Sequence, residues 1–123
     1  MRILMVVAAW LLANFAIAAT TAQIVVQSSP VAGFQFYAGK SIWKKMHEGD
    51  VLGLVREPAN SYDTQAVRVE WHGIKLGYLP RRDNTAVARL LDNGIALNAR
   101  ISRLTKSHNP WQRVMFDIYE PMP

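Results

Sequence analysis

A short loop carries an aromatic ring and a carboxylate close together, at Asn60, Tyr62 and Asp63. The ring of Tyr62 can stack on a base or a sugar, and the carboxylate of Asp63 can accept a hydrogen bond from a hydroxyl. Because a carboxylate repels phosphate groups, Asp63 favours binding only at a chain end that carries a free hydroxyl. Asn and Asp also shape turns in many loops, so a purely structural role for this loop stays open.

A second candidate site combines the aromatic residues Phe36 and Tyr37 with Lys40. An exposed aromatic ring beside a lysine is a stacking platform for an unpaired base. The pattern predicts a strand over residues 31–37, in which Phe34 faces the core, Phe36 shares its face and Tyr37 points the other way. In the alternative interpretation, all the aromatic side chains of this segment pack in the core.

Basic residues gather at the start of a predicted helix, where Arg81 and Arg82 follow Tyr78. Helix electrostatics favour acidic residues at this end, so two adjacent arginines need another explanation. We interpret them as a phosphate site assisted by the helix N-terminus, with an ordinary solvated surface as the alternative. The three segments together predict a nucleic-acid-binding surface formed by Phe36, Tyr37, Lys40, Asn60, Tyr62, Asp63, Tyr78, Arg81 and Arg82.

Motifs for catalysis or metal binding are absent from the sequence. It contains no cysteine, which excludes disulfides, iron–sulfur clusters, Cys-type zinc sites and a thiol nucleophile. His47, His72 and His108 are far apart, and the glycines are scattered without forming a phosphate-binding loop. No serine lies in a nucleophile motif. We therefore expect a non-enzymatic protein that needs neither a metal nor a cofactor.

The length and the charge fit one small basic domain. The chain has 123 residues and a formal net charge of +5. Removing an N-terminal leader that contains Arg2 leaves 13 basic residues against 9 acidic ones, a charge of +4. A basic domain of this size favours polyanionic partners.

Residues 1–22 have the pattern of a cleaved secretory signal peptide. Arg2 precedes an apolar run over residues 3–13, which is shorter than the ~20 residues needed to span a bilayer. Small residues further on predict cleavage after Ala18 or Ala22. The expected location is periplasmic or extracellular, and a retained inner-membrane signal anchor is the alternative. A buried N-terminal helix fits less well, because the segment has no polar face.

Alternation of apolar and polar residues predicts a mainly β domain over residues 23–123. The expected strands cover residues 31–37, 51–56, 66–71, 74–79, 97–104 and 113–119. One short helix is expected over residues 42–46, capped by Ser41, and another from a cap at Asp83, Asn84 or Thr85 to Asn93. Residues 24–29 are expected only to lead into the domain. This set of elements predicts a small OB-like or SH3-like β-barrel of about six strands with two short helices.

The predicted core comes from one face of each strand and one stripe of the second helix. His72 and Gly73 form a tight connection, so the strands on either side of them should form a hairpin. The side chains expected to face inward are Val67, Val69, Trp71, Val87, Leu90, Leu91, Val114, Phe116 and Ile118.

The ordered set of segments resembles the HIRAN domain over residues 31–104. The segments that carry the resemblance are VAGFQFY at 31–37, LVREP at 54–58, NSYD at 60–63, AVRV at 66–69 and LGYLP at 76–80. The resemblance implies a compact barrel of OB type that binds single-stranded DNA, notably at its 3′ end. With a signal peptide, the chain resembles a stand-alone bacterial member of the family that is exported.

Some positions depart from the pattern of the DNA-binding members. Gln35 stands where those members have Arg, and Ser61 replaces a Pro in the loop. Tyr78 occupies the position of a His, whereas Arg81 matches a Lys that meets phosphate. We therefore expect a non-enzymatic module that binds single-stranded nucleic acid at a 3′-hydroxyl end. The alternative is an exported envelope protein that uses the same groove for a peptide or protein partner.

Overall fold

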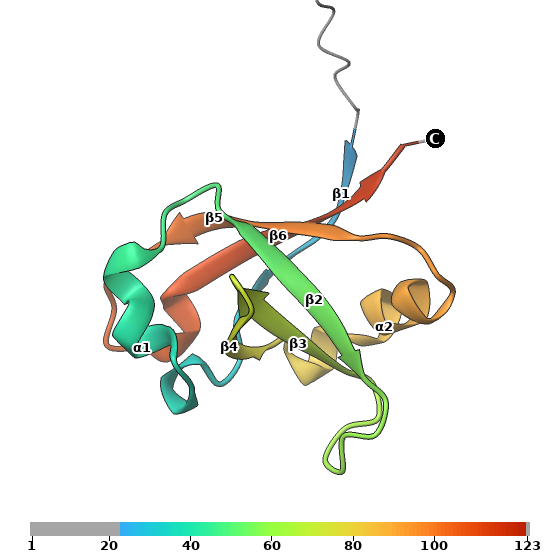
Figure 1. Cartoon of the computed structure of the whole chain (residues 1–123), viewed down its shortest axis with the longest axis horizontal. Helices are drawn as coiled ribbons and strands as arrows, with labels where there is room; N and C mark the ends of the chain where they lie inside the picture. Colours follow the sequence, from blue (N-terminus) through green and yellow to red (C-terminus); the bar gives the residue numbers. More distant parts are fainter. Residues whose placement is uncertain (1–22, 123) are drawn as a thin grey trace, which may run out of the picture.

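The computed structural model describes residues 23–122, so the predicted signal peptide lies outside the described residues. Six antiparallel strands form one sheet, β1 (Gln23–Pro30), β2 (Val51–Glu57), β3 (Ala66–Trp71), β4 (Ile74–Tyr78), β5 (Asn98–Leu104) and β6 (Val114–Pro121) (Figure 1). Two short helices, α1 (Gly39–Ile42) and α2 (Thr85–Asp92), pack beside it. The predicted mainly β fold with six strands and two short helices is confirmed.

The sheet curls until its two edges nearly meet. The strand order is β1-β6-β5-β2-β3-β4, which leaves β1 and β4 at the edges. Just after β1, Ala32 exchanges two backbone hydrogen bonds with Tyr78, of 2.7 and 2.9 Å between N and O. The backbones come so close that a Cβ at Gly77 would overlap the carbonyl oxygen of Ala32. One bridge therefore joins the edges and gives the sheet its barrel-like form.

The predicted hairpin and core faces are confirmed. The turn between β3 and β4 has positive φ at both His72 and Gly73, as a tight two-residue hairpin requires. The core holds the inward faces of β3 and β6 together with Val87 and Ala88 of α2, while Leu90 and Leu91 are partly buried. The buried residues of the two strands are Val67, Val69, Trp71, Val114, Phe116 and Ile118.

The strand predicted over residues 31–37 is wrong. Gly33 adopts a positive φ of 75°, and Phe34–Phe36 form a 3₁₀ helix, η2. The chain turns at Gly33, which stops the extended conformation. In a 3₁₀ helix residues two apart lie on different faces, so Phe34 is buried (1% exposed) while Phe36 is 76% exposed. The prediction that Phe34 faces the core is confirmed, but the prediction that Phe36 shares its face is wrong.

Two further elements differ from the sequence prediction. The chain ahead of Val31 forms β1, which pairs along β6 and projects beyond the barrel (Figure 1). The first helix begins at Gly39, ahead of the predicted start, and a 3₁₀ helix η3 (Trp43–Lys45) follows it. Ser41 does not cap it, because its hydroxyl donates to the carbonyl of Ala38.

Within residues 23–122, no helix is long and apolar enough to cross a membrane. The same residues contain no group of three or more His, Cys, Asp or Glu side chains arranged to hold a metal ion.

Candidate nucleic-acid interface

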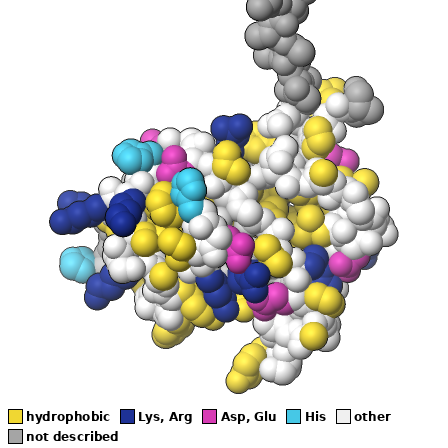
Figure 2. Space-filling model, viewed as in Figure 1, with side chains coloured by type: hydrophobic (Ala, Val, Ile, Leu, Met, Phe, Trp, Pro, Cys, Tyr) yellow, Lys and Arg dark blue, Asp and Glu magenta, His cyan; other side chains and the backbone are white. Residues whose placement is uncertain are grey.

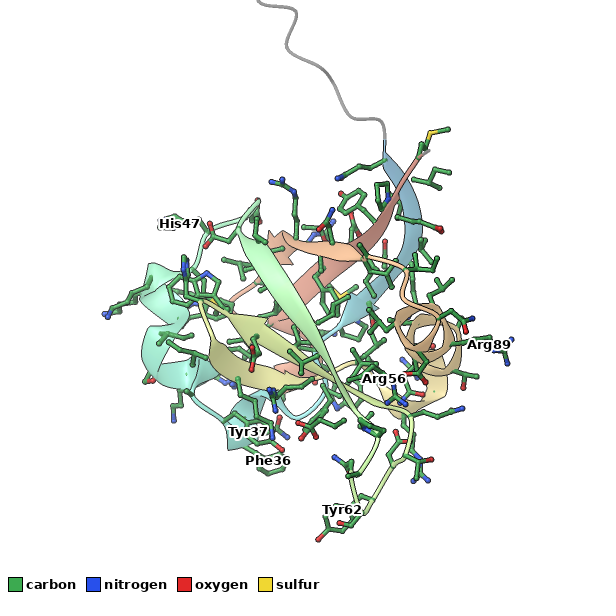
Figure 3. All side chains as sticks on the ribbon, turned by 45° about the vertical axis from the view of Figure 1, so that its right-hand side comes forward. Phe36, Tyr37, His47, Arg56, Tyr62 and Arg89 are labelled. Atoms are coloured by element: carbon green, nitrogen blue, oxygen red, sulfur yellow. The ribbon has the colours of Figure 1, made fainter. Side chains whose placement is uncertain are left out.

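One groove of about 570 Å³ collects most of the predicted site residues. It lies between the turn after η2, the β2–β3 loop, β4 and the segment that leads into α2. Figure 3 shows Phe36, Tyr37 and Tyr62 projecting from the same side of the barrel. The predicted residues that line this groove are Tyr37, Asn60, Tyr62, Asp63, Tyr78 and Arg81.

Asn60 shapes the loop that carries Tyr62. Its Oδ1 accepts hydrogen bonds from the backbone N–H groups of Tyr62 and Asp63, at 2.9 and 3.1 Å. Its Nδ2 donates to the carboxylate of Glu57 at 3.0 Å. These bonds hold the loop while the ring of Tyr62 stays 88% exposed. Asn60 thus acts through the loop conformation, and Tyr62 offers a free ring face.

Asp63 is held by the fold on both of its carboxylate oxygens. Oδ1 accepts from the backbone N–H of Gln65 at 2.9 Å, and Oδ2 accepts from Nδ2 of Asn84 at 2.7 Å. Asn84 is 1% exposed and stands immediately before α2, but its side chain makes no capping hydrogen bond. Each oxygen of a carboxylate has about two acceptor sites. Asp63, which lines the groove, therefore shapes a turn, and its oxygens still have acceptor capacity.

The wall of the groove contains a lysine between two tyrosine rings. The ammonium of Lys75 lies 4.1 Å from the ring centroid of Tyr37 and 4.4 Å from that of Tyr78. It donates to the hydroxyl of Tyr78 at 2.7 Å, and that hydroxyl donates to Glu57 at 2.9 Å. Arg68 also donates to Glu57, at 2.8 Å. The groove therefore has a rigid polar wall that keeps a positive charge on an aromatic surface.

The ionisation of this wall is fixed near neutral pH. Burial opposes the charge of Glu57, but hydrogen bonds from Asn60, Tyr78 and Arg68 outweigh it and lower the pKa of the carboxyl. Burial likewise opposes the charge of Lys75, but its hydrogen bond to Tyr78 and the nearby phenols raise the pKa of the ammonium. Burial and the carboxylate of Glu57 raise the pKa of Tyr78. Lys75 stays a cation and Tyr78 stays a neutral donor.

The two arginines predicted as a phosphate site lie differently. Both belong to a 3₁₀ helix η4 (Arg81–Asp83). Arg81 lines the groove and an adjoining polar hollow of about 370 Å³ over residues 61–65. The side chain of Arg82 is 75% exposed and outside the groove lining, 3.5 Å from Asp83 and 5.9 Å from the ring centroid of Trp111. Arg81 thus faces the groove, whereas Arg82 faces outward.

Two more predicted residues lie outside the groove lining. Lys40 lines a different pocket, together with Phe34 and Trp43. Phe36 stands on the exposed side of η2, next to the groove residue Tyr37. The structure thus brings six of the nine predicted residues into one groove and leaves Phe36, Lys40 and Arg82 around it.

Lys75 is the groove cation that the predicted site residues omit. It lies in β4, three residues before Tyr78. The buried and partly buried positions of this strand do not alternate regularly. From the sequence, a lysine in a short strand is expected to be solvated. Its contact with Tyr37, which depends on the tertiary fold, places Lys75 in the groove. Glu57 and Asn84 were missed for the same reason, because their partners are distant in sequence.

The fold and the groove define a small β-barrel domain whose polar and aromatic side chains converge on one surface. The HIRAN domain family model matches residues 24–122, and the chain belongs to this family. The mouse and rabbit helicase-like transcription factors are each 33% identical over 67 residues, which is 54% of this chain and 6% of each relative.

Solved structures show the same fold. A protein from Lactobacillus plantarum superposes with a TM-score of 0.70 at 25% identity, covering 80% of this chain and 95% of its own. The HIRAN domain of human HLTF superposes with a TM-score of 0.59 at 20% identity, covering 80% of each chain. The predicted membership of the HIRAN family is confirmed.

Proposed function

We propose that this chain is a non-enzymatic module that binds single-stranded nucleic acid, and DNA in particular, at a 3′ end with a free hydroxyl. The observation that carries the proposal is the composition of the groove. Exposed aromatic rings, two cations and one carboxylate converge in a volume of about 570 Å³. Membership of the HIRAN family supports DNA as the ligand, because the family resemblance implies this binding.

The aromatic residues supply affinity that does not depend on base identity. Tyr62 is 88% exposed at the tip of a loop that Asn60 holds in place. Phe36 is 76% exposed on the same side of the barrel (Figure 3). Stacking of a base on an aromatic ring contributes about 1–3 kcal/mol and tolerates any sequence. A single strand with unstacked bases fits these rings, whereas the paired bases of a duplex are not free to stack on them.

The charged residues favour a phosphate beside a hydroxyl. Arg81 makes no ion pair among the described residues, so its guanidinium is free to bind a phosphate in the groove. Asp63 keeps acceptor capacity although the fold uses both of its oxygens. A carboxylate in a groove for a polyanion favours a terminal hydroxyl, to which it accepts a hydrogen bond. A terminal phosphate would bring like charges together.

The test compares labelled oligothymidines that end in a 3′-hydroxyl or a 3′-phosphate, by fluorescence anisotropy. The wild-type chain should prefer the hydroxyl. Asp63→Ala should weaken binding of the 3′-hydroxyl strand by about 1–3 kcal/mol, the range for a hydrogen bond to a charged group. The same change should leave binding of the 3′-phosphate strand unaltered or improve it. Tyr62→Ala should weaken both by about 1–3 kcal/mol, because stacking ignores the end group.

Two charge-removing variants distinguish binding in the groove from general electrostatic attraction to the basic protein. Arg81→Gln should weaken both strands and reduce the log–log salt slope by about 0.7, the value for one contact to a single strand. Arg89→Gln removes the same charge from the exposed face of α2 (Figure 3) and should change neither. The proposal fails if the wild type binds no oligonucleotide at low salt and micromolar protein. The chain-end part fails if Asp63→Ala weakens both end groups equally.

A further inference from the structure

A second pocket lies on the other side of the η2 turn and has no part in the chain-end site. Its volume is about 470 Å³. The half-buried ring of Trp43 forms its apolar surface and is supported from below by the buried ring of Phe34, which it meets edge to face with centroids 5.9 Å apart. Lys40, Lys106 and Arg113 contribute cations to the lining. The remaining lining residues are Thr105, Ser107 and His108.

The charge of this pocket is uncompensated. No Asp or Glu is among the described residues that line it, and none of its three cations takes part in an ion pair within residues 23–122. Lys40 and Lys106 are exposed and line the pocket from two different elements, α1 and the β5–β6 connection. Figure 2 shows Lys, Arg and His side chains gathered at the α1 end of the visible face. An apolar surface under several free cations matches a ligand with a planar ring and a phosphate.

Hydrogen bonds and close packing hold the residues around the pocket. The guanidinium of Arg113 donates to the carbonyl of Ser107 at 2.9 Å and lies 6.0 Å from the ring centroid of Phe34. In the same connection, Asn109 accepts from the backbone N–H of Trp111 at 3.1 Å. Phe34 itself packs so tightly on Gly39 that a Cβ there would overlap the ring. A ligand therefore meets a preformed surface and causes little loss of loop freedom.

The turn of η2 connects this pocket to the groove. Phe34 lines the pocket and Tyr37 lines the groove, and they are three residues apart in the chain. Phe36 lies between them in the chain and is 76% exposed. The two hollows thus flank the short η2 turn, and a strand that runs from one to the other passes over this turn. Single OB folds bind about 4–16 nucleotides, so a site that continues beyond a terminal nucleotide is within the range of such domains.

We infer that this second pocket binds the internal nucleotides of the same strand, on the 5′ side of the end that occupies the groove. One base lies against the half-buried Trp43, while Lys40, Lys106 and Arg113 bind phosphates of the strand. The inference rests on the proposed function, because it extends the site along one ligand. The protein then binds the 3′ end of a strand together with several nucleotides on the 5′ side of that end.

The experiment measures affinity against strand length for 3′-hydroxyl oligothymidines of three and eight nucleotides, at two salt concentrations. The double variant Lys40→Gln with Lys106→Gln changes two exposed side chains and should fold as the wild type does. It should bind the 3-mer as the wild type does but bind the 8-mer about fivefold or more weakly. Its log–log salt slope for the 8-mer should fall by about 1.4, twice the value for one single-strand contact.

The matched control is Arg89→Gln with Arg100→Gln, which removes two charges from exposed positions of α2 and β5 outside both hollows. It should bind both oligonucleotides as the wild type does. Equal losses in the control and the Lys40/Lys106 variant would overturn the inference in favour of general charge attraction. Equal affinity of the wild type for the 3-mer and the 8-mer would also overturn it and leave the chain-end proposal intact. If the wild type binds neither oligonucleotide, the proposed function itself fails.

Discussion

Asn84 donates a hydrogen bond from its side-chain amide to the carboxylate of Asp63 at 2.7 Å. The bond joins the β2–β3 loop to the first residue before α2, which is 21 positions away. Because Asn84 is 1% exposed, its amide cannot swing out to water. The position of the carboxylate in the groove is therefore set by the core-facing start of a helix as well as by the loop.

Asn84→Ala should destabilise the fold and leave the end-group preference in place. A hydrogen bond to a charged group contributes about 1–3 kcal/mol, so the free energy of unfolding should fall by about this amount in urea titrations. The backbone N–H of Gln65 still holds the other oxygen of the Asp63 carboxylate, so the variant should still prefer a 3′-hydroxyl to a 3′-phosphate. Asn93→Ala on the exposed end of α2 is the control and should change stability by less than about 0.5 kcal/mol. An unchanged urea midpoint for Asn84→Ala would show that the bond does not support the fold.

Gly77→Ala should open the bridge that joins the two edges of the sheet. A Cβ at this position would overlap the carbonyl oxygen of Ala32, and the backbone has a φ of 155°. Either the Ala32–Tyr78 hydrogen bonds break or the strands separate, so we expect a loss of more than about 2 kcal/mol in the free energy of unfolding.

Gly53→Ala is the matched control for that change. Gly53 also lies in a strand, but the nearest atom to a new Cβ would be a side-chain carbon of Glu70 at 3.8 Å, an ordinary contact. Replacing a strand glycine that has room should be neutral or stabilise by up to about 1 kcal/mol. Similar midpoints for the two variants in thermal denaturation would contradict the role given to the bridge.

The local sequence predicts the elements that follow a simple period. In β3 the alternation of Val67, Val69 and Trp71 matches the buried face, and the pair His72-Gly73 identifies the hairpin turn. Where a strand pairs with a segment that is distant in the sequence, its own alternation of apolar and polar residues is weaker. The chain that forms β1 contains Gln27 and Ser28, and its extended conformation depends on pairing with β6 about 90 residues later.

The site residues can also be divided into those that the local sequence predicts and those that depend on long-range contacts. The side-chain chemistry of Tyr62, Asp63 and Arg81 predicted a common binding site, and the fold brings these residues together in the groove. The place of Lys75 over Tyr37 could not be predicted, since it depends on the η2 turn meeting β4 across the sheet edge. The strand predicted over 31–37 fails for a related reason, because Gly33 and the packing of Phe34 impose a turn on a segment of high β-propensity.

For the leader, we propose that the mature chain begins at Ala19 or Gln23 and is exported. Cleavage after Ala22 keeps residues 23–30 and their pairing with β6. N-terminal sequencing of protein from the periplasmic fraction of a bacterial host should give one of these two residues. Ala22→Leu should block processing if cleavage follows Ala22, and Ala18→Leu should block it if cleavage follows Ala18, because signal peptidase needs a small residue there. Residues 1–18 retained on protein from the membrane fraction would establish the signal anchor instead.

Stability should fall in acid partly through Glu57. Hydrogen bonds lower the pKa of its carboxyl in the folded chain below the ordinary value of 4.5. The unfolded state therefore binds more protons than the folded state in this range, and stability rises with pH. The contribution of Glu57 is complete above pH 4.5 and disappears as the pH falls through the lowered pKa of the folded state. Asp50 and Asp92 also have lowered pKa values, so some acid sensitivity is independent of Glu57.

Glu57→Gln should therefore flatten the decline in the free energy of unfolding between about pH 5 and pH 3, measured by urea titration at each pH. At pH 7 the variant should be less stable by about 1–3 kcal/mol, because Arg68 and Tyr78 lose their charged acceptor. Tyr78→Phe provides an intermediate case for comparison. It removes one of the hydrogen bonds that lower the pKa but keeps the carboxylate, so its decline should lie between those of the wild type and Glu57→Gln. Superimposable pH profiles for all three proteins would show that the network around Glu57 does not couple protonation to the fold.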